Sequence, residues 1–173
     1  MKDSRRYLIV DILLYYCYPL FMLYAFALGN NISGQVLYRM RSQECCYLVW
    51  PNNVDNYLDM LLHHKPQYIV GLGMYSGRDQ DQIRIETVVK NQFRNAPIET
   101  SLPMEATMNL KVFLPLLENV KVATGLGNSW CNLISWRIMT LITAGKLRSH
   151  YNFLHIPQRF SIRHAAEIID HMC

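Results

Sequence analysis

From residue 30 onward, short apolar segments typical of buried strands alternate with segments that have the apolar spacing of amphipathic helices. The segments with strand character are 35–40, 45–50, 68–73, 84–93, 119–124 and 151–156. The segments with helical character are 53–64, 105–117, 128–143 and 161–172. This alternation predicts an α/β sandwich with a mostly parallel sheet. Because 173 residues is the length of one ordinary domain, we expect a single domain over residues 1–173.

Residues 7–29 form an apolar run behind two arginines, which is the pattern of a signal peptide or a membrane anchor. Asp11 and Pro19 interrupt the run, and both disfavour a membrane-spanning helix. A buried strand over residues 7–15, followed by an apolar helix that starts near Pro19, explains the same run. We favour this buried arrangement and a cytoplasmic protein. Export or membrane association through residues 7–29 stays as the alternative.

The composition excludes several classes of protein. Hydrophobic residues make up 51% of the chain and charged residues 17%, which excludes intrinsic disorder. The net charge of +4 comes from scattered basic residues, so we expect no nucleic-acid partner. The five cysteines form no CxxC motif and the chain has no HExxH motif, so we predict neither a zinc site nor a redox dithiol. An odd number of cysteines without these motifs fits a reduced, cytosolic chain.

Cys131 is the candidate nucleophile. A strand over residues 119–124 leads into a glycine turn at 125–127, and Asn128 or Ser129 caps the following helix. Cys131 therefore lies in the first turn of that helix. The free amides and the dipole at a helix start stabilise a thiolate, and the amides can also hold an oxyanion. The alternative interpretation is a buried structural cysteine.

His155 and Glu86 are the candidate partners of this thiol. His155 lies at the carboxyl end of the strand over 151–156, where parallel α/β sheets carry their active sites. It is either a base next to the thiol or an ordinary interior histidine. Glu86 lies in an otherwise apolar strand, and a buried carboxylate needs a partner. That partner is His155 in a catalytic arrangement, or Arg84 or Arg78 in a structural one.

Five segments carry a resemblance to a known family when they are taken together and in order. They are YIVGLG (68–73) with Gly77-Arg78, RIETVV (84–89), SLP (101–103), GNSWCN (127–132) and FLHIP (153–157). This set resembles pyroglutamyl peptidase I, also called pyrrolidone carboxyl peptidase, a family of cysteine peptidases. The resemblance is clearest over residues 46–173.

The resemblance implies a role for each candidate residue. Cys131 would be the nucleophile, His155 the general base and acid, and Glu86 the carboxylate that orients the imidazole. It also implies a single-domain α/β/α sandwich around a twisted, mostly parallel mixed sheet of the phosphorylase/hydrolase-like class. No metal or organic cofactor is implied, and the implied partners are a peptide with a blocked N-terminus and further copies of the chain in a homo-oligomer.

The substrate pocket of the family is less well matched. The family's glutamine that contacts the pyroglutamyl ring aligns with Met74, which offers no comparable hydrogen bond. Trp130 stands where the family has a small pocket residue, and Arg94 takes the place of a family arginine at a shorter spacing. The apolar N-terminal segment 7–29 diverges, and the family's first loop is not recognisable in it. We therefore expect Met74, Trp130 and Arg94 to shape substrate binding differently.

Two hypotheses follow from these matches and departures. The first is a thiol protease that removes an N-terminal pyroglutamyl or related residue through a thioester intermediate. The second is a catalytically weak or inactive scaffold of the same fold, which binds a partner or associates with a membrane.

Overall fold

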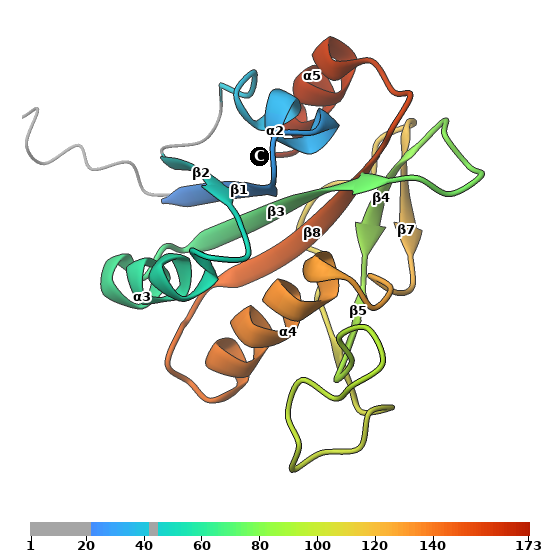
Figure 1. Ribbon diagram of the computed structural model, residues 1–173. Coiled ribbons are helices and arrows are strands. Elements are labelled where there is room, and N and C mark those ends of the chain that lie inside the picture. The colour runs from blue at the N-terminus through green and yellow to red at the C-terminus, as the bar shows by residue number, and fades with distance from the viewer. Residues whose placement is uncertain (1–21, 42–44) are drawn as a thin grey trace, which may run out of the picture.

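The computed structural model describes residues 22–41 and 45–173, and a six-stranded sheet runs through its centre (Figure 1). The strands of this sheet are β1 (Leu23–Leu28), β2 (Cys45–Val49), β3 (Tyr68–Tyr75), β4 (Ile83–Glu86), β7 (Val120–Ala123) and β8 (His150–Pro157). The helices are α2 (Ile32–Leu37), α3 (Val54–His64), α4 (Trp130–Thr143) and α5 (Ile162–Met172). A separate two-stranded sheet pairs β5 (Val88–Lys90) with β6 (Thr107–Asn109).

The strand order of the large sheet is β2-β1-β3-β8-β4-β7. Neighbouring strands are parallel except for β4 and β8, which are antiparallel. Helices cover both faces of the sheet: α2 and α5 lie on one side, and α3 and α4 lie on the other (Figure 1). The predicted α/β/α sandwich with a mostly parallel mixed sheet is therefore confirmed.

Each face of the sheet has its own hydrophobic core, and the side-chain alternation of the strands decides which residue joins which core. In β8, Leu154 and Ile156 pack toward α2 and α5, whereas Tyr151 and Phe153 pack toward α3 and α4. The same alternation places the next odd-numbered residue of β8, His155, on the α4 face of the sheet.

The predicted apolar helix that starts near Pro19 is wrong over residues 23–28, which form β1. This strand lies between β2 and β3, and residues 23–27 are buried. A strand that is covered on both faces is apolar throughout, so its sequence looks the same as that of a buried helix. The strand predicted over residues 7–15 lies outside the described residues, as does the part of the leader or anchor alternative over residues 7–21. None of the helices that are described is long and apolar enough to cross a membrane.

The predicted strand over residues 35–40 is also wrong, because α2 covers residues 35–37 and a turn follows at residues 38–39. The Asn31 side chain accepts a hydrogen bond from the backbone N–H of Ser33 and caps the helix. Ile32, Val36 and Met40 then follow each other at the four-residue spacing of one helix face, and all three are buried.

Two further predictions differ from the structure. Residues 105–117 are not a helix but contain β6 and irregular chain, because Asn152 of β8 takes over their backbone hydrogen bonds. Its side chain accepts from the N–H of Phe113 and of Leu114, and donates to the carbonyl of Lys111. The strand predicted over residues 84–93 is divided at Thr87 into β4 and β5, which belong to different sheets.

Candidate active site

The geometry of the sheet brings His155 and Glu86 together. The antiparallel pairing of β8 with β4 sets His155 opposite Arg84, and Phe153 opposite Glu86. Nδ1 of His155 lies 2.9 Å from Oε1 of Glu86, and both side chains are buried. Nε of Arg84 donates to the same carboxylate oxygen over 3.1 Å. Glu86 therefore has both partners that its sequence position suggested, the histidine and an arginine.

Cys131 joins this pair above Gly73 of β3. Gly73 lies opposite His155 in the parallel pairing of β3 with β8. A Cβ atom built on Gly73 would lie 2.9 Å from Sγ of Cys131 and 2.9 Å from Cδ2 of His155. The thiol and the imidazole thus occupy the space above one glycine, and a larger residue at position 73 would displace them.

The environment of His155 favours its charged form. Burial disfavours the imidazolium, but the hydrogen bonds and charges of Cys131 and Glu86 outweigh burial and raise the pKa of His155 to about 9. The imidazolium is therefore the main form of His155 at neutral pH. Because Nδ1 is bound to Glu86, Nε2 is the nitrogen that is left for proton transfer.

The start of α4 supplies backbone N–H groups next to the thiol. Within the described residues, the N–H groups of Trp130 and Cys131 have no hydrogen-bond acceptor, as is usual at the first positions of a helix. Ser129 is the N-cap, and its side chain makes no capping hydrogen bond. These amides, together with the positive end of the helix dipole, can stabilise a negatively charged oxygen close to Cys131.

Asn132 fixes this helix start to the rest of the fold. Its fully buried side chain accepts from the N–H of Lys90 over 2.9 Å, and it donates to the carbonyls of Lys90 and Gln92 over 2.8 and 2.6 Å. The neighbouring backbone of Asn128 and Arg94 is joined by a further hydrogen bond of 2.6 Å. No local sequence pattern marks this role of Asn132, because its side chain satisfies backbone groups that are distant in the sequence.

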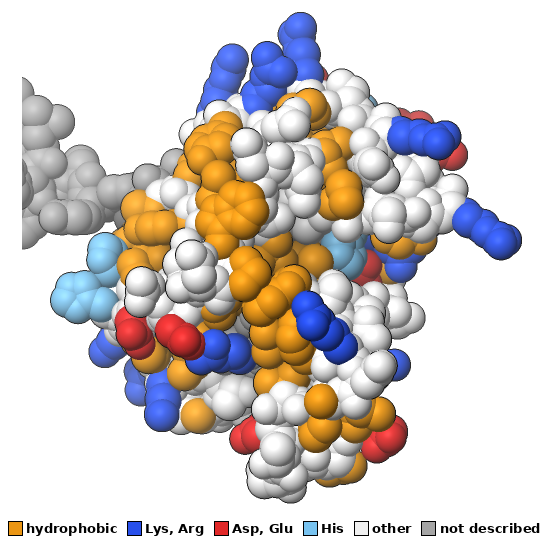
Figure 2. All heavy atoms as spheres, in the orientation of Figure 1, with side chains coloured by type: hydrophobic (Ala, Val, Ile, Leu, Met, Phe, Trp, Pro, Cys, Tyr) orange, Lys and Arg blue, Asp and Glu red, His pale blue; other side chains and the backbone are white. Residues whose placement is uncertain are grey.

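A cavity of about 530 Å³ opens next to Cys131. Its walls come from residues 28–31 after β1, residues 49–51 at the end of β2, Met74 of β3, and residues 129–131 at the start of α4. Figure 2 shows hydrophobic side chains gathered in a band across the face of the molecule on which α4 begins. The cavity lies where the parallel strands β1, β2 and β3 end, which is the usual position of a site in this class of sheet.

Met74 and Trp130, two of the predicted substrate-binding residues, line this cavity, and Arg94 does not. Arg94 lies in the loop after β5, where its guanidinium carbon is 5.2 Å from the centre of the Phe93 ring. Leu28 and Trp50 also line the cavity and are not among the predicted binding residues. The rule that sites form at the carboxyl ends of parallel strands would have pointed to both of them, once β1 and β2 had been recognised as neighbours.

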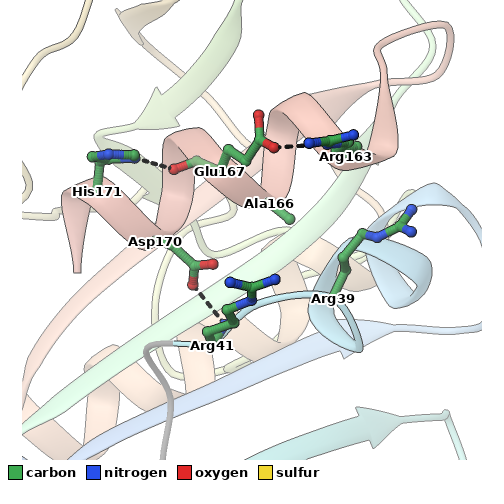
Figure 3. A pocket seen from close by; sticks show the side chains of 7 residues that line it. All are labelled: Arg39, Arg41, Arg163, Ala166, Glu167, Asp170 and His171. Atoms are coloured by element: carbon green, nitrogen blue, oxygen red, sulfur yellow. Dashed lines mark hydrogen bonds and ion pairs between the residues drawn. The ribbon is translucent and has the colours of Figure 1, made fainter.

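A second cavity, of about 660 Å³, lies between α5 and the chain after α2 and is lined mostly by charged side chains (Figure 3). Arg163 is paired with Glu167 over 2.8 Å, and Asp170 accepts from the backbone N–H of Arg41 over 2.8 Å. None of the candidate catalytic residues borders it. Residues 22–41 and 45–173 contain no group of three or more His, Cys, Asp or Glu side chains placed to hold a metal ion.

Comparisons with known proteins add evidence about the fold. Neither a protein-family model nor a curated protein matches the chain. Pyrrolidone carboxyl peptidase from Thermococcus litoralis has a similar structure, with a TM-score of 0.69 and 12% identity over 86% of this chain and 89% of that one. Pyroglutamyl peptidase I from Bacillus amyloliquefaciens matches with a TM-score of 0.69 and 17% identity over 86% and 92% of the two chains. The pyrrolidone carboxyl peptidase from Thermus thermophilus matches with a TM-score of 0.67 and 14% identity over 87% of this chain and 98% of that one. The chain therefore has the fold of these peptidases.

Proposed function

We propose that the chain is a cysteine peptidase that cleaves the amide bond after a blocked N-terminal residue, pyroglutamyl or a related acyl group. The observation that carries this proposal is the convergence of Cys131, His155 and Glu86 above Gly73, beside a cavity open to the thiol. The shared fold with pyroglutamyl peptidases supports the same reaction class. The arrangement of these three residues supports the roles that the sequence predicts for them.

The first half of the reaction forms a thioester. Sγ of Cys131 attacks the substrate carbonyl carbon, and the C=O π electrons move to oxygen, which the N–H groups of Trp130 and Cys131 stabilise. The C–N bond then breaks as Nε2 of His155 donates its proton to the departing amine. In the second half, the neutral Nε2 accepts a proton from water, the hydroxyl oxygen attacks the thioester carbon, and the thiolate leaves. Glu86 keeps the imidazole in one orientation throughout.

Alkylation of the thiols tests the proposal without a choice of substrate. We expect iodoacetamide to modify Cys131 faster than the exposed Cys46 at about pH 6, because a neighbouring imidazolium stabilises the thiolate. Mass spectrometry of each cysteine peptide gives both rates in one sample. The advantage of Cys131 should be lost in His155→Ala, which removes the imidazolium.

Turnover provides the matched activity test. Hydrolysis of pyroglutamyl-aminomethylcoumarin should be abolished in Cys131→Ala and kept in Cys173→Ala, because Cys173 lies at the chain terminus, after α5. If Cys131 reacts no faster than Cys46 and His155→Ala changes neither rate, the peptidase proposal fails. The hypothesis of a non-catalytic scaffold with this fold would then replace it.

A further inference from the structure

We propose that the cavity beside Cys131 accepts an uncharged, apolar acyl group, so that amides of such groups are better substrates than pyroglutamyl amides. This inference rests on the proposed function, because it names the substrate class of the same thiol. It is carried by the apolar side chains of the cavity wall and by the hydrogen bonds in which the Asn31 side chain is already engaged.

The cavity wall is dominated by apolar side chains, two of which are unusually exposed. Leu28, Val49 and Trp130 line the cavity together with Trp50 and Met74. Trp50 is 44% exposed and Met74 is 36% exposed, although both are large hydrophobic residues. A bound apolar group would remove this surface from water, which is favourable in proportion to the area covered.

The polar side chains of the wall are poorly placed to bind a lactam ring. Oδ1 of Asn31 accepts from the N–H and the hydroxyl of Ser33, and its Nδ2 donates to the carbonyl of Leu28. The side chain of Asn31 is therefore committed to capping α2. Asn30 and Ser129, the other polar residues of the wall, are exposed at its rim. A pyroglutamyl ring brings one N–H and one carbonyl, and burying these groups without partners is unfavourable.

The wall next to the thiol is fixed in place before any substrate binds. The Trp130 ring packs against the Phe93 ring with 4.8 Å between the ring centres, and Asn132 anchors the same helix turn. The volume of about 530 Å³ falls in the range of sites that bind drug-sized ligands, roughly 300–1,000 Å³. The cavity thus has room for an acyl group larger than a five-membered ring, such as phenylacetyl.

The cyclopentanecarbonyl and pyroglutamyl amides of aminomethylcoumarin have nearly the same shape, so comparing their hydrolysis tests whether the cavity prefers an apolar acyl group or a lactam. Cyclopentanecarbonyl has the ring size of pyroglutamyl but lacks the lactam N–H and carbonyl. We expect kcat/KM to be about tenfold or more higher for the cyclopentanecarbonyl amide, because its ring requires no hydrogen-bond partners. Met74→Gln should lower this preference by adding polar groups to the wall, whereas Met74→Leu should retain it. A preference for the pyroglutamyl amide in the wild type would overturn the inference and leave the peptidase proposal intact.

Binding to the Cys131→Ala variant keeps the inference testable if the wild type hydrolyses neither amide. Quenching of tryptophan fluorescence by cyclopentanecarboxamide and by pyroglutamic acid amide gives the two dissociation constants without chemistry. Tighter binding of the apolar amide, again by about tenfold, would show that the cavity prefers an apolar acyl group, even if the peptidase proposal had failed. Equal binding, or tighter binding of the lactam, would overturn the inference.

Discussion

Nδ1 of His155 lies 2.9 Å from Oε1 of Glu86, with 9% of the histidine side chain and 1% of the glutamate side chain exposed. A buried carboxylate keeps its charge only when cationic or hydrogen-bonding partners replace water. Here His155 and Arg84 share a single carboxylate oxygen. The Glu86 carboxylate therefore both holds the imidazole of His155 in place and favours its protonated form.

Replacing Glu86 with glutamine should lower the rate of peptide hydrolysis by about 10²-fold or more. Glutamine preserves the size of the side chain and can still accept from Nδ1, but it carries no negative charge to stabilise the imidazolium. The alkylation of Cys131 at about pH 6 should slow in the same variant, because the thiolate loses its cationic partner. Steady-state kinetics and mass spectrometry measure the two effects.

Glu167→Gln is the matched control for this change. Glu167 lies on α5 and is paired with Arg163, and both side chains are at least half exposed. The variant should hydrolyse substrate at the wild-type rate and show the wild-type alkylation of Cys131. A Glu86→Gln protein within twofold of the wild type in both measurements would show that Glu86 is a structural residue only.

The fold class was predictable because its signals are local. Apolar spacing marks α3, α4 and α5, and Ser161 caps α5 as its sequence suggests, by accepting from the N–H of His164. The elements that could not be predicted depend on distant partners. Asn152 supplies the hydrogen bonds that hold residues 111–114 in a non-helical conformation. Its role is visible only when β8 and this segment are placed side by side.

The candidate site also combines residues that local sequence signals mark with residues that only the fold brings together. Cys131 could be selected because a glycine turn and a helix start surround it, and His155 because it lies near the end of a strand. The cavity wall could not be foreseen, since the order β2-β1-β3 determines which loops meet. A helix is predicted where β1 lies, so the prediction places neither Leu28 nor Trp50 near the thiol.

The stability of the fold should decrease as the pH rises through about 9. The pKa of His155 increases from 6.5 in the unfolded chain to about 9 in the folded protein. A raised pKa contributes stability that is fully present below about pH 6.5 and is lost as the pH passes about 9. The shift corresponds to on the order of 3 kcal/mol. Urea unfolding at a series of pH values should show this decrease in the wild type relative to His155→Gln.

The Cys131→Ala variant separates the sources of that pH dependence. Cys131 and Glu86 both favour the imidazolium, so removing the thiol should leave only the contribution of the carboxylate. We expect Cys131→Ala to show a smaller decrease in unfolding free energy than the wild type and a larger one than His155→Gln. Identical pH profiles for all three proteins would contradict the assigned interactions.

Gly73→Ala should separate the thiol from the imidazole. The new methyl group would lie 2.9 Å from Sγ of Cys131 and 2.8 Å from Cε1 of Phe153, so these atoms must move. We expect a loss of about 1–3 kcal/mol in stability and at least a tenfold loss of activity. Gly71→Ala is the control, because its methyl group would meet Phe153 and Phe26 but not the thiol. It should cost similar stability and leave the alkylation rate of Cys131 closer to that of the wild type.

Asn132→Ala should reduce both stability and the reactivity of Cys131. The change leaves the N–H of Lys90 and the carbonyls of Lys90 and Gln92 without their partner, at a cost of about 1–3 kcal/mol for each group that stays buried. Asn91→Ala is a close control, because the Asn91 side chain is also fully buried and donates to the carbonyls of Glu99 and Leu102.

Asn132→Ala and Asn91→Ala should differ only in the reactivity of the Cys131 thiol. Asn91 holds a loop that does not include the start of α4, whereas Asn132 holds the helix turn that carries Cys131 and the oxyanion-binding amides. Chemical denaturation should therefore show comparable losses of stability for both, while alkylation of the folded protein at about pH 6 should slow in Asn132→Ala alone. If Asn91→Ala slows the thiol as much, the position of Cys131 depends on overall stability rather than on the anchoring of its helix.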